Sequence, residues 1–333
     1  MYTRWNDYTV YLLNRYGTKV YRIGIDGGFT CPHRSSKHSG GCIYCDALGS
    51  SSVYLRTHES NFTRKSSFEK DIDNKIPHPF DDSMATRLSA IDEQILKGKA
   101  YLDTRFPSTK RSIYFQAYTN TFDTVEHLKM LYDRALSSGE YVELIISTRP
   151  DCITHDVVDL LLSYKKKVMS VWVELGLQSG NEESLKYLNR GHTVEDYKRA
   201  VSLLKGGGIE VSTHIILGIP GETDQHILRT ASLIREVESD AVKIHNLHVV
   251  AGTKLYEAYK RGEVEVPDMA DHLYNTILFL THIPKDIVIQ RLVSDTPKHR
   301  LAAPRDFPDK GYFLQSLEKS MKEQHVYQGE WIK

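Results

Sequence analysis

The sequence predicts an α/β protein whose core is a partial (β/α)6 barrel, with extensions at both ends. From about residue 110 onward, segments rich in β-forming residues alternate with segments of helical periodicity, which is typical of a parallel sheet covered by helices. Six strand–helix units are too few for a closed eight-fold barrel. Polar residues also gather where the expected strands end, and in parallel α/β folds this edge carries the ligand site.

The expected strands are rich in β-branched and aromatic residues. The first, Val20–Ile25, leads directly into a loop that contains several cysteines. The others are Arg111–Tyr118, Tyr141–Ser147, Ser170–Leu177, Ile209–Leu217 and Ala241–Val250, with Asp286–Val293 as a candidate seventh.

The expected helices lie between these strands, and several begin at a Ser or Thr that can cap the first turn. They are Ser83–Lys97, Thr124–Ser138, Thr154–Lys167, Asn181–Asn189, Val194–Lys205, Thr223–Glu238, Lys254–Arg261 and about Phe313–Gln324. Residues 46–82 are polar and irregular, and we expect them to form a long excursion on the side of the functional site. The expected organisation is an N-terminal extension (1–19), the barrel core (20–260) and a C-terminal extension packed on it (261–333).

The composition limits the classes of protein that this chain can represent. Its 333 residues include 43 Lys+Arg and 43 Asp+Glu, and this balance argues against a uniformly basic, nucleic-acid-coating surface but permits a local basic groove. No apolar run approaches the roughly 20 residues that span a bilayer, and the N-terminus lacks signal-peptide features. Four cysteines are too few for a disulfide scaffold in a chain of this length. These features predict a cytoplasmic protein that does not enter a membrane.

Three of the four cysteines, Cys31, Cys42 and Cys45, lie in one loop, where Gly40 and Gly41 allow the backbone to wrap. Three thiolates at this spacing predict a site for a soft metal. One interpretation is a Cys3His zinc site, and the other is an iron–sulfur cluster with one iron left open. A disulfide is a weaker interpretation, because three clustered cysteines cannot pair completely.

The zinc interpretation requires a fourth ligand, for which His33 and His38 are the candidates. However, polar groups also end five further strands, in the runs Gln116–Asn120, Ser147–Asp151, Glu174–Ser179, Gly218–Glu222 and Lys243–His248. A structural zinc site would not need polar residues at the ends of five further strands. These residues therefore favour a cluster with a polar co-substrate beside it. We expect at most one of His245 and His248 to face the cavity, because their odd spacing on a strand directs them to opposite sides. Cys152, far from the loop, is expected to be a structural thiol.

These motifs together resemble the radical S-adenosylmethionine (SAM) enzymes. The loop closes with Cys-x-aromatic-Cys at Cys42–Cys45, and the run Glu174–Thr193 resembles the matching segment of the Elongator catalytic subunit. The spacing from Gln178 to Arg190 also matches the oxygen-independent coproporphyrinogen oxidases, and Gly218–Glu222 (GIPGE) resembles the adenine-contacting turn of the superfamily. The resemblance covers roughly residues 10–300 and implies a TIM-like partial barrel.

The resemblance implies that Cys31, Cys42 and Cys45 hold a [4Fe–4S] cluster whose open iron binds SAM. An external one-electron reductant of flavodoxin or ferredoxin type is implied as a partner. The implied SAM contacts are Tyr44, Gln116, Thr119, Asn120, Glu174, Gln178, Arg190, Gly218 and Gly221. Tyr44 would pack near the adenine, although a plain packing aromatic is the alternative. The run from Gln116 to Asn120 stands where the family binds the methionyl amino group. It lacks the Gly-Gly-Glu motif that is usual at this position in the family.

The remaining assignments follow the same resemblance. Glu174, Gln178 and Arg190 match ribose- and carboxylate-binding positions, while Gly218 and Gly221 would let the backbone approach the adenine edge. Ser147 stands where Elongator-type sequences have Glu, so one carboxylate is missing. The acetyltransferase domain of Elongator is also missing, so its acetyl-CoA-dependent reaction is not expected here.

The implied function is that of a radical SAM enzyme acting on tRNA at a wobble uridine. The coproporphyrinogen oxidase spacing supports an alternative, a radical SAM enzyme that acts on a small molecule such as a tetrapyrrole precursor. An alternative of another class is a zinc-stabilised RNA-binding protein without catalysis.

Overall fold

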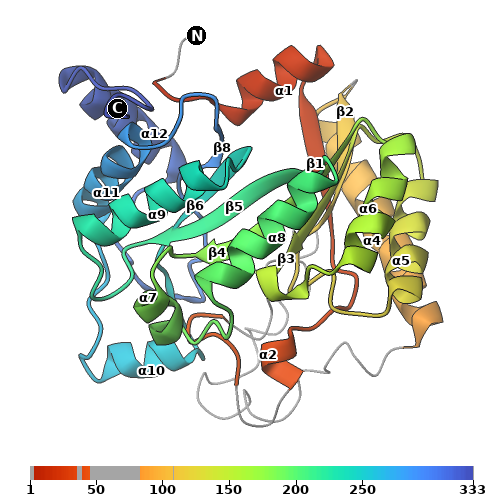
Figure 1. The fold of residues 1–333 in the computed structure, drawn as a ribbon, viewed down its shortest axis with the longest axis horizontal. Helices are drawn as coiled ribbons and strands as arrows, with labels where there is room; N and C mark the ends of the chain where they lie inside the picture. The colour runs from red at the N-terminus through yellow and green to blue at the C-terminus, as the bar shows by residue number, and fades with distance from the viewer. Residues whose placement is uncertain (1–3, 36–39, 46–82, 108, 333) are drawn as a thin grey trace.

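The computed structural model describes residues 4–35, 40–45, 83–107 and 109–332. Its core is a seven-stranded, curled parallel sheet in the order β1-β2-β3-β4-β5-β6-β8 (Figure 1). The strands are β1 (Val20–Ile25), β2 (Lys110–Phe115), β3 (Glu143–Thr148), β4 (Ser170–Gln178), β5 (Glu210–Leu217), β6 (Ala241–Asn246) and β8 (Val288–Arg291). The predicted partial barrel is confirmed, and the candidate seventh strand joins it beside β6.

Helices cover the outer side of this sheet. They are α4 (Met84–Arg105), α5 (Val125–Ser137), α6 (His155–Ser163), α8 (Val194–Gly206), α9 (Asp224–Glu236) and α11 (Met269–Thr281). The short helices α7 (Glu182–Tyr187) and α10 (Lys254–Lys260) instead lie toward the end where the strands finish (Figure 1). Thr124 and Thr154 cap α5 and α6, as expected from the sequence, each accepting a hydrogen bond from a backbone N–H in the first turn. In α5 the apolar stripe, which includes Leu128 and Leu131, is fully buried, so this face packs into the core.

The terminal segments close the two ends of the curled sheet. Helix α1 (Tyr8–Tyr16) lies at the end where the strands begin, and there Tyr8 and Tyr16 donate hydrogen bonds to Glu143 (Figure 1). The short α2 (Pro32–Ser35) follows Cys31 at the opposite end. Helix α12 (Lys310–Glu323) packs on α11. Residues 261–333 thus supply a strand of the main sheet, and the division of the chain at 260 stays a prediction.

Several elements differ from their expected form. Helix α4 continues beyond Lys97, because Leu102 extends the buried stripe of Ile91 and Ile95. The helix expected to reach Lys167 ends at Ser163 and is followed by a 3₁₀ turn. The expected strand Ala241–Val250 is broken, and Val249–Val250 forms β7, which pairs with β9 (Leu301–Ala303) in a separate antiparallel ribbon. Helix α11 was not expected, and the excursion at 46–82 lies outside the described residues.

Candidate active site

The three clustered cysteines lie at the end of the sheet where the strands finish, and each thiol has a hydrogen-bond donor. Thr119 Oγ1 lies 3.0 Å from Cys31 Sγ, and Arg190 Nη1 lies 3.2 Å from Cys42 Sγ. Arg34 Nη2 lies 3.1 Å from Cys45 Sγ and also donates to the Cys45 carbonyl oxygen. Donors directed at sulfur stabilise the thiolate form that a metal centre requires.

Burial opposes these donors and raises the pKa of the Cys31 and Cys45 thiols. The hydrogen bond from Thr119 and the positive charge of Arg34 act in the opposite direction at the two sites. Within the described part of the chain, no three His, Cys, Asp or Glu side chains converge as they would around a single metal ion. A zinc site needs this convergence, whereas a cluster binds each thiolate at a different iron. His38 lies outside the described residues.

The segment after α7 holds the cysteine loop in place. Asn189 Nδ2 donates to the Gly41 carbonyl oxygen at 2.7 Å, and the Ile43 N–H donates to the Leu188 carbonyl oxygen at 3.1 Å. Gly191 has a φ of +70°, and a Cβ there would lie 2.8 Å from the His33 ring. The Asn-Arg-Gly run therefore fits closely against the loop, which explains why glycine follows Arg190.

Arg190 joins the loop to strand β4. Its Nη1 donates to Tyr44 Oη at 3.1 Å as well as to Cys42, and its Nη2 donates to the Gly176 carbonyl oxygen at 2.7 Å. Burial and the neighbouring Arg190 lower the pKa of His192 to about 3, so this imidazole is neutral. The structure thus brings Arg190 and Tyr44, two of the predicted SAM contacts, together at the cysteines.

The loop after β2 approaches the cysteines from the other side. Tyr118 adopts a φ of 61° and lies beneath the guanidinium of Arg34. Asn120 Nδ2 donates to the Ser147 carbonyl oxygen at 2.7 Å, while its Oδ1 is buried with no hydrogen-bond partner among the described residues. The predicted contact Gln116 begins this loop, where its N–H donates to the Ile25 carbonyl oxygen. A tyrosine with a left-handed backbone conformation and a buried amide oxygen without a partner are both unfavourable in a folded protein. Such features are common at ligand-binding sites.

Glu174 lies inside the barrel, fully buried, and not at the rim. Its Oε1 accepts from Arg22 at 2.9 Å, and its Oε2 accepts from Tyr114, His214 and Lys243 at 2.6–2.9 Å. Burial alone would raise the pKa of this carboxyl, but the surrounding positive charge holds it well below its usual range. Both carboxylate oxygens are therefore engaged by the protein, and the role of Glu174 as a SAM contact stays a prediction.

The predicted glycines lie in the turn between β5 and α9. Gly218 and Gly221 have φ values of +89° and +85°, a backbone conformation that favours glycine. Gly218 also packs against Pro267, whose ring carbon would lie 2.4 Å from an added Cβ. The turn thus requires glycine at both positions, and its approach to an adenine stays a prediction.

A cavity of about 270 Å³ opens beside the cysteine loop. Tyr44, Cys45 and Gln178 border one side of it, and Gln178 adopts a φ of 76° where the pairing of β4 with β5 shifts register. His214, His245, His248 and Arg291 are among the residues that line the rest. The expectation that at most one of His245 and His248 would face the cavity is wrong, because β6 ends at Asn246 and the strand alternation stops before His248.

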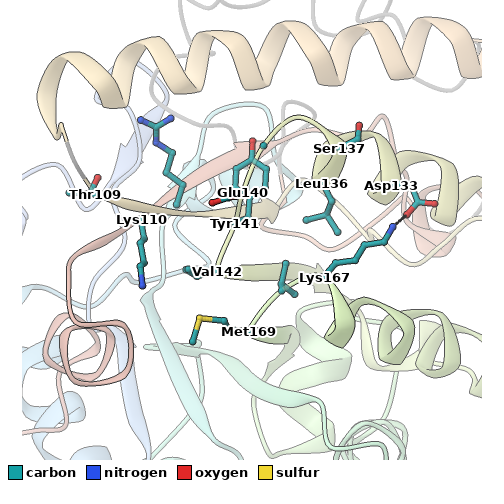
Figure 2. A pocket seen from close by; sticks show the side chains of 13 residues that line it. Thr109, Lys110, Asp133, Leu136, Ser137, Glu140, Tyr141, Val142, Lys167 and Met169 are labelled. Atoms are coloured by element: carbon teal, nitrogen blue, oxygen red, sulfur yellow. Dashed lines mark hydrogen bonds and ion pairs between the residues drawn. The ribbon is translucent and has the colours of Figure 1, made fainter.

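A wider hollow of about 900 Å³ lies at the opposite edge of the sheet (Figure 2). Lys110, Val142 and Met169 line it where β2, β3 and β4 begin. Figure 2 shows Lys167 beside Asp133, and the two form an ion pair of 2.8 Å across its wall. Since parallel strands present their ligand sites at the other edge, this hollow is not part of the candidate site.

The family comparison agrees with the position of the cysteines. The sequence model of the Radical SAM superfamily matches residues 30–234, and that of the Radical SAM C-terminal domain matches residues 239–323. The chain belongs to the radical SAM superfamily. Enzymes of this superfamily in general use SAM and a [4Fe–4S] cluster, and the thiols, their donors and the orphaned oxygen of Asn120 fit such cofactors.

This radical SAM chain is similar to protein YhcC of Escherichia coli K12, with 30% identity over 96% of the chain and 92% of the relative. It is also 37% identical to the tRNA uridine(34) acetyltransferase of Methanocaldococcus infernus, over 47% of the chain and 29% of that protein. Among solved structures, the archaeal Elp3 of M. infernus superposes with a TM-score of 0.64 and 25% identity, covering 74% of this chain and 62% of that one. No helix in the described ranges is long and apolar enough to cross a membrane.

Several site residues were not identified from the sequence. Arg34 lies three positions after Cys31, on the first turn after a metal-ligand candidate, and this spacing could have indicated it. Asn189 stands within the run that resembles Elongator, yet its loop-holding contact is visible only in the fold. Arg291 ends a strand that is far from the cysteines in the sequence, and no local pattern marks it.

Proposed function

We propose that this radical SAM enzyme reductively cleaves SAM at a [4Fe–4S] cluster held by Cys31, Cys42 and Cys45 and so starts hydrogen abstraction from a tRNA, at a wobble uridine. The cluster would supply one electron to the sulfonium of SAM, received from an external reductant of flavodoxin or ferredoxin type. The observation that carries the proposal is the set of donors from Thr119, Arg190 and Arg34, one to each thiol. The protein would orient SAM and exclude water.

The residues proposed to contact SAM are those predicted from the sequence. Tyr44 and Gln178 border the cavity beside Cys45, and this position supports them. Arg190 supports a carboxylate site, since its guanidinium is buried among acceptors of the loop. The full proposed set is Tyr44, Gln116, Thr119, Asn120, Glu174, Gln178, Arg190, Gly218 and Gly221.

The tRNA substrate is supported by the relatives. One relative is named as a tRNA uridine(34) acetyltransferase, and it shares about half of this chain. The exposed Lys298 and the partly exposed Arg300 lie on the segment that borders the cavity, where they would suit a phosphate backbone.

Anaerobic reconstitution tests the cofactor proposal. We expect about four iron and four sulfide per chain and release of 5′-deoxyadenosine when SAM and a reductant are added. Cys42→Ala should lose the cluster. Cys152→Ala is the matched control, because this buried thiol, whose pKa burial raises to about 12, is not one of the three proposed ligands, so its variant should keep the cluster. Bound zinc without nucleoside release would refute the proposal.

The tRNA proposal is tested in a strain that lacks the gene. Mass spectrometry of tRNA nucleosides should show a changed wobble uridine that the wild-type gene restores and Cys42→Ala does not. An unchanged wobble uridine would exclude this substrate, while 5′-deoxyadenosine release would still support the enzyme class.

A further inference from the structure

Arg291 lines one wall of the cavity. Arg291 ends β8 beside Lys243 of β6, and its Nη1 lies 3.4 Å from His245 Nε2. Among the residues that the structure describes, no Asp or Glu forms an ion pair with Arg291. An arginine that lines a cavity in this way can bind an acidic group through a planar fork of N–H donors.

The interior charge beneath this wall is also positive. Glu174 forms ion pairs with both Arg22 and Lys243. Its single negative charge is therefore already shared by two basic side chains and does not neutralise Arg291. Burial lowers the pKa of Lys243 to about 7, and the nearby Arg291 contributes to that decrease. Asp295 also lines the cavity but forms no ion pair with Arg291 among the described residues, so a negative ligand group would be the direct counter-charge of Arg291.

The two neighbouring imidazoles have tautomers set by their partners. Arg291 can only donate, so His245 Nε2 accepts and its Nδ1 carries the hydrogen. The ionised Glu174 can only accept, so His214 Nε2 carries the hydrogen, at 2.9 Å, and its Nδ1 is a bare acceptor. Neither Nδ1 is buried or hydrogen-bonded among the described residues, and both side chains line the cavity. The ring centroids lie 5.6 Å apart.

We propose that Arg291, His245 and His214 form a recess that binds a carboxylate or phosphate of the substrate, with a neighbouring hydroxyl or N–H donating to His214. Arg291 and the Nδ1–H of His245 would donate to the anion. The same cavity borders Tyr44 and Cys45, so a substrate anchored here lies beside the cysteine loop. The inference rests on the proposed function, because it makes the recess the substrate side of a radical SAM site.

The carboxylate of SAM is the competing source of an anion. Arg190 already stands at Cys42 and Tyr44, at the loop where SAM is proposed to bind. Arg291 lines the wall formed by the ends of β6 and β8, where its side chain contacts His245. The recess is therefore assigned to the substrate, and SAM affinity separates the two sources.

Equilibrium binding to the anaerobically reconstituted protein tests the recess. Inorganic phosphate and acetate are titrated with detection by ³¹P and ¹³C NMR, and SAM is titrated separately by calorimetry. We expect Arg291→Gln to weaken binding of at least one anion by about tenfold or more and to change SAM affinity by less than about twofold. The matched control is Lys322→Gln on α12, which removes the same charge from an exposed position that does not line the cavity and should leave anion binding unchanged.

Arg291→Lys keeps the positive charge but loses the planar set of guanidinium N–H donors, so we expect its anion affinity to be intermediate. This variant replaces Arg291→Gln in the test if Arg291→Gln fails to fold. A wild-type protein that binds neither anion, or an equal loss in Lys322→Gln, would overturn the recess. A parallel loss of SAM affinity in Arg291→Gln would assign Arg291 to the cofactor and equally overturn the proposal. Release of 5′-deoxyadenosine by the wild type is scored independently, so the recess can fail while the proposed function stands.

Discussion

The candidate cluster site is characterised by the hydrogen-bond donors around its cysteines as well as by the cysteines themselves. Each of the three thiols receives one donor, from a hydroxyl at Cys31 and from guanidinium groups at Cys42 and Cys45. Hydrogen bonds to ligating sulfur are among the factors that set the potential of an iron–sulfur cluster. These three donors would therefore adjust the energy of the proposed electron transfer to SAM.

Thr119→Val tests this at the residue scale. Valine keeps the shape of threonine but removes the Oγ1–H that lies 3.0 Å from Cys31 Sγ. We expect the cluster to assemble and its midpoint potential to become more negative, because the charge on sulfur loses a donor. A redox titration followed by electron paramagnetic resonance measures this. Thr119→Ser keeps the hydroxyl and should match the wild type, whereas equal potentials in all three proteins would contradict the assignment.

A buried histidine outside the site predicts a pH dependence of stability. His272 is 1% exposed and packs on Phe313. Its Nε2 lies 3.0 Å from the Leu292 carbonyl oxygen, which only accepts, so Nε2 carries the hydrogen and donates it. Burial lowers its pKa from 6.5 to about 4. Between these values the unfolded chain binds more protons than the folded one, so the free energy of unfolding falls as pH falls from 6.5 to 4, by up to roughly 3 kcal/mol.

Urea unfolding at a series of pH values checks this expectation. His272→Gln keeps a side-chain N–H but cannot take up a proton, so its free energy of unfolding should depend less on pH than that of the wild type. Parallel pH profiles for the two proteins would show that His272 does not carry the effect.

At the scale of elements, capping residues and hydrophobic periodicity predicted helices and strands correctly. The ends of elements that no local sequence signal marks were not predicted correctly. Thr124 and Thr154 begin α5 and α6 as expected, because capping depends on neighbours within one turn. The break between β6 and β7 was missed, because β7 exists through its pairing with β9, about fifty residues later. Helix α4 runs longer than expected, because packing of Leu102 extends it.

The turn between β5 and α9 offers a paired test at this scale. Gly218 and Gly221 share a left-handed backbone, so alanine at either position should cost about 1–2 kcal/mol of unfolding free energy. Gly218→Ala should cost more, because its Cβ would lie 2.4 Å from Pro267, whereas nothing lies within 4 Å of a Cβ at Gly221. Urea denaturation measures both, and equal losses would contradict the close contact with Pro267.

At the scale of the whole molecule, one ion network joins strands from across the barrel. Glu174 of β4 binds Arg22 of β1 and Lys243 of β6, and it also accepts from Tyr114 of β2. A closed barrel usually fills its interior with branched apolar side chains. Here a buried carboxylate takes that position, and it supports the cavity wall through His214.

Glu174→Gln should therefore destabilise the fold by about 3–5 kcal/mol, because the buried Lys243 and the partly buried Arg22 lose their counter-charge. Urea unfolding checks the loss, and adding Lys243→Met to this variant should recover part of it. Glu210→Gln is the control, since its ion pair with Arg15 is partly exposed and should contribute about 1 kcal/mol or less. Similar losses in the two single variants would contradict the buried network as a source of stability.

The sequence by itself determined the cysteine trio, the strand–helix order and the polar rim, because these depend on spacing along the chain and on the rule that parallel strands end at one edge. Only the tertiary structure decided which side chains meet there. Arg190 lies 148 residues from Cys42, and Arg291 lies 46 residues from His245. Such contacts depend on how far the sheet curls and where β6 ends, and non-local packing sets both.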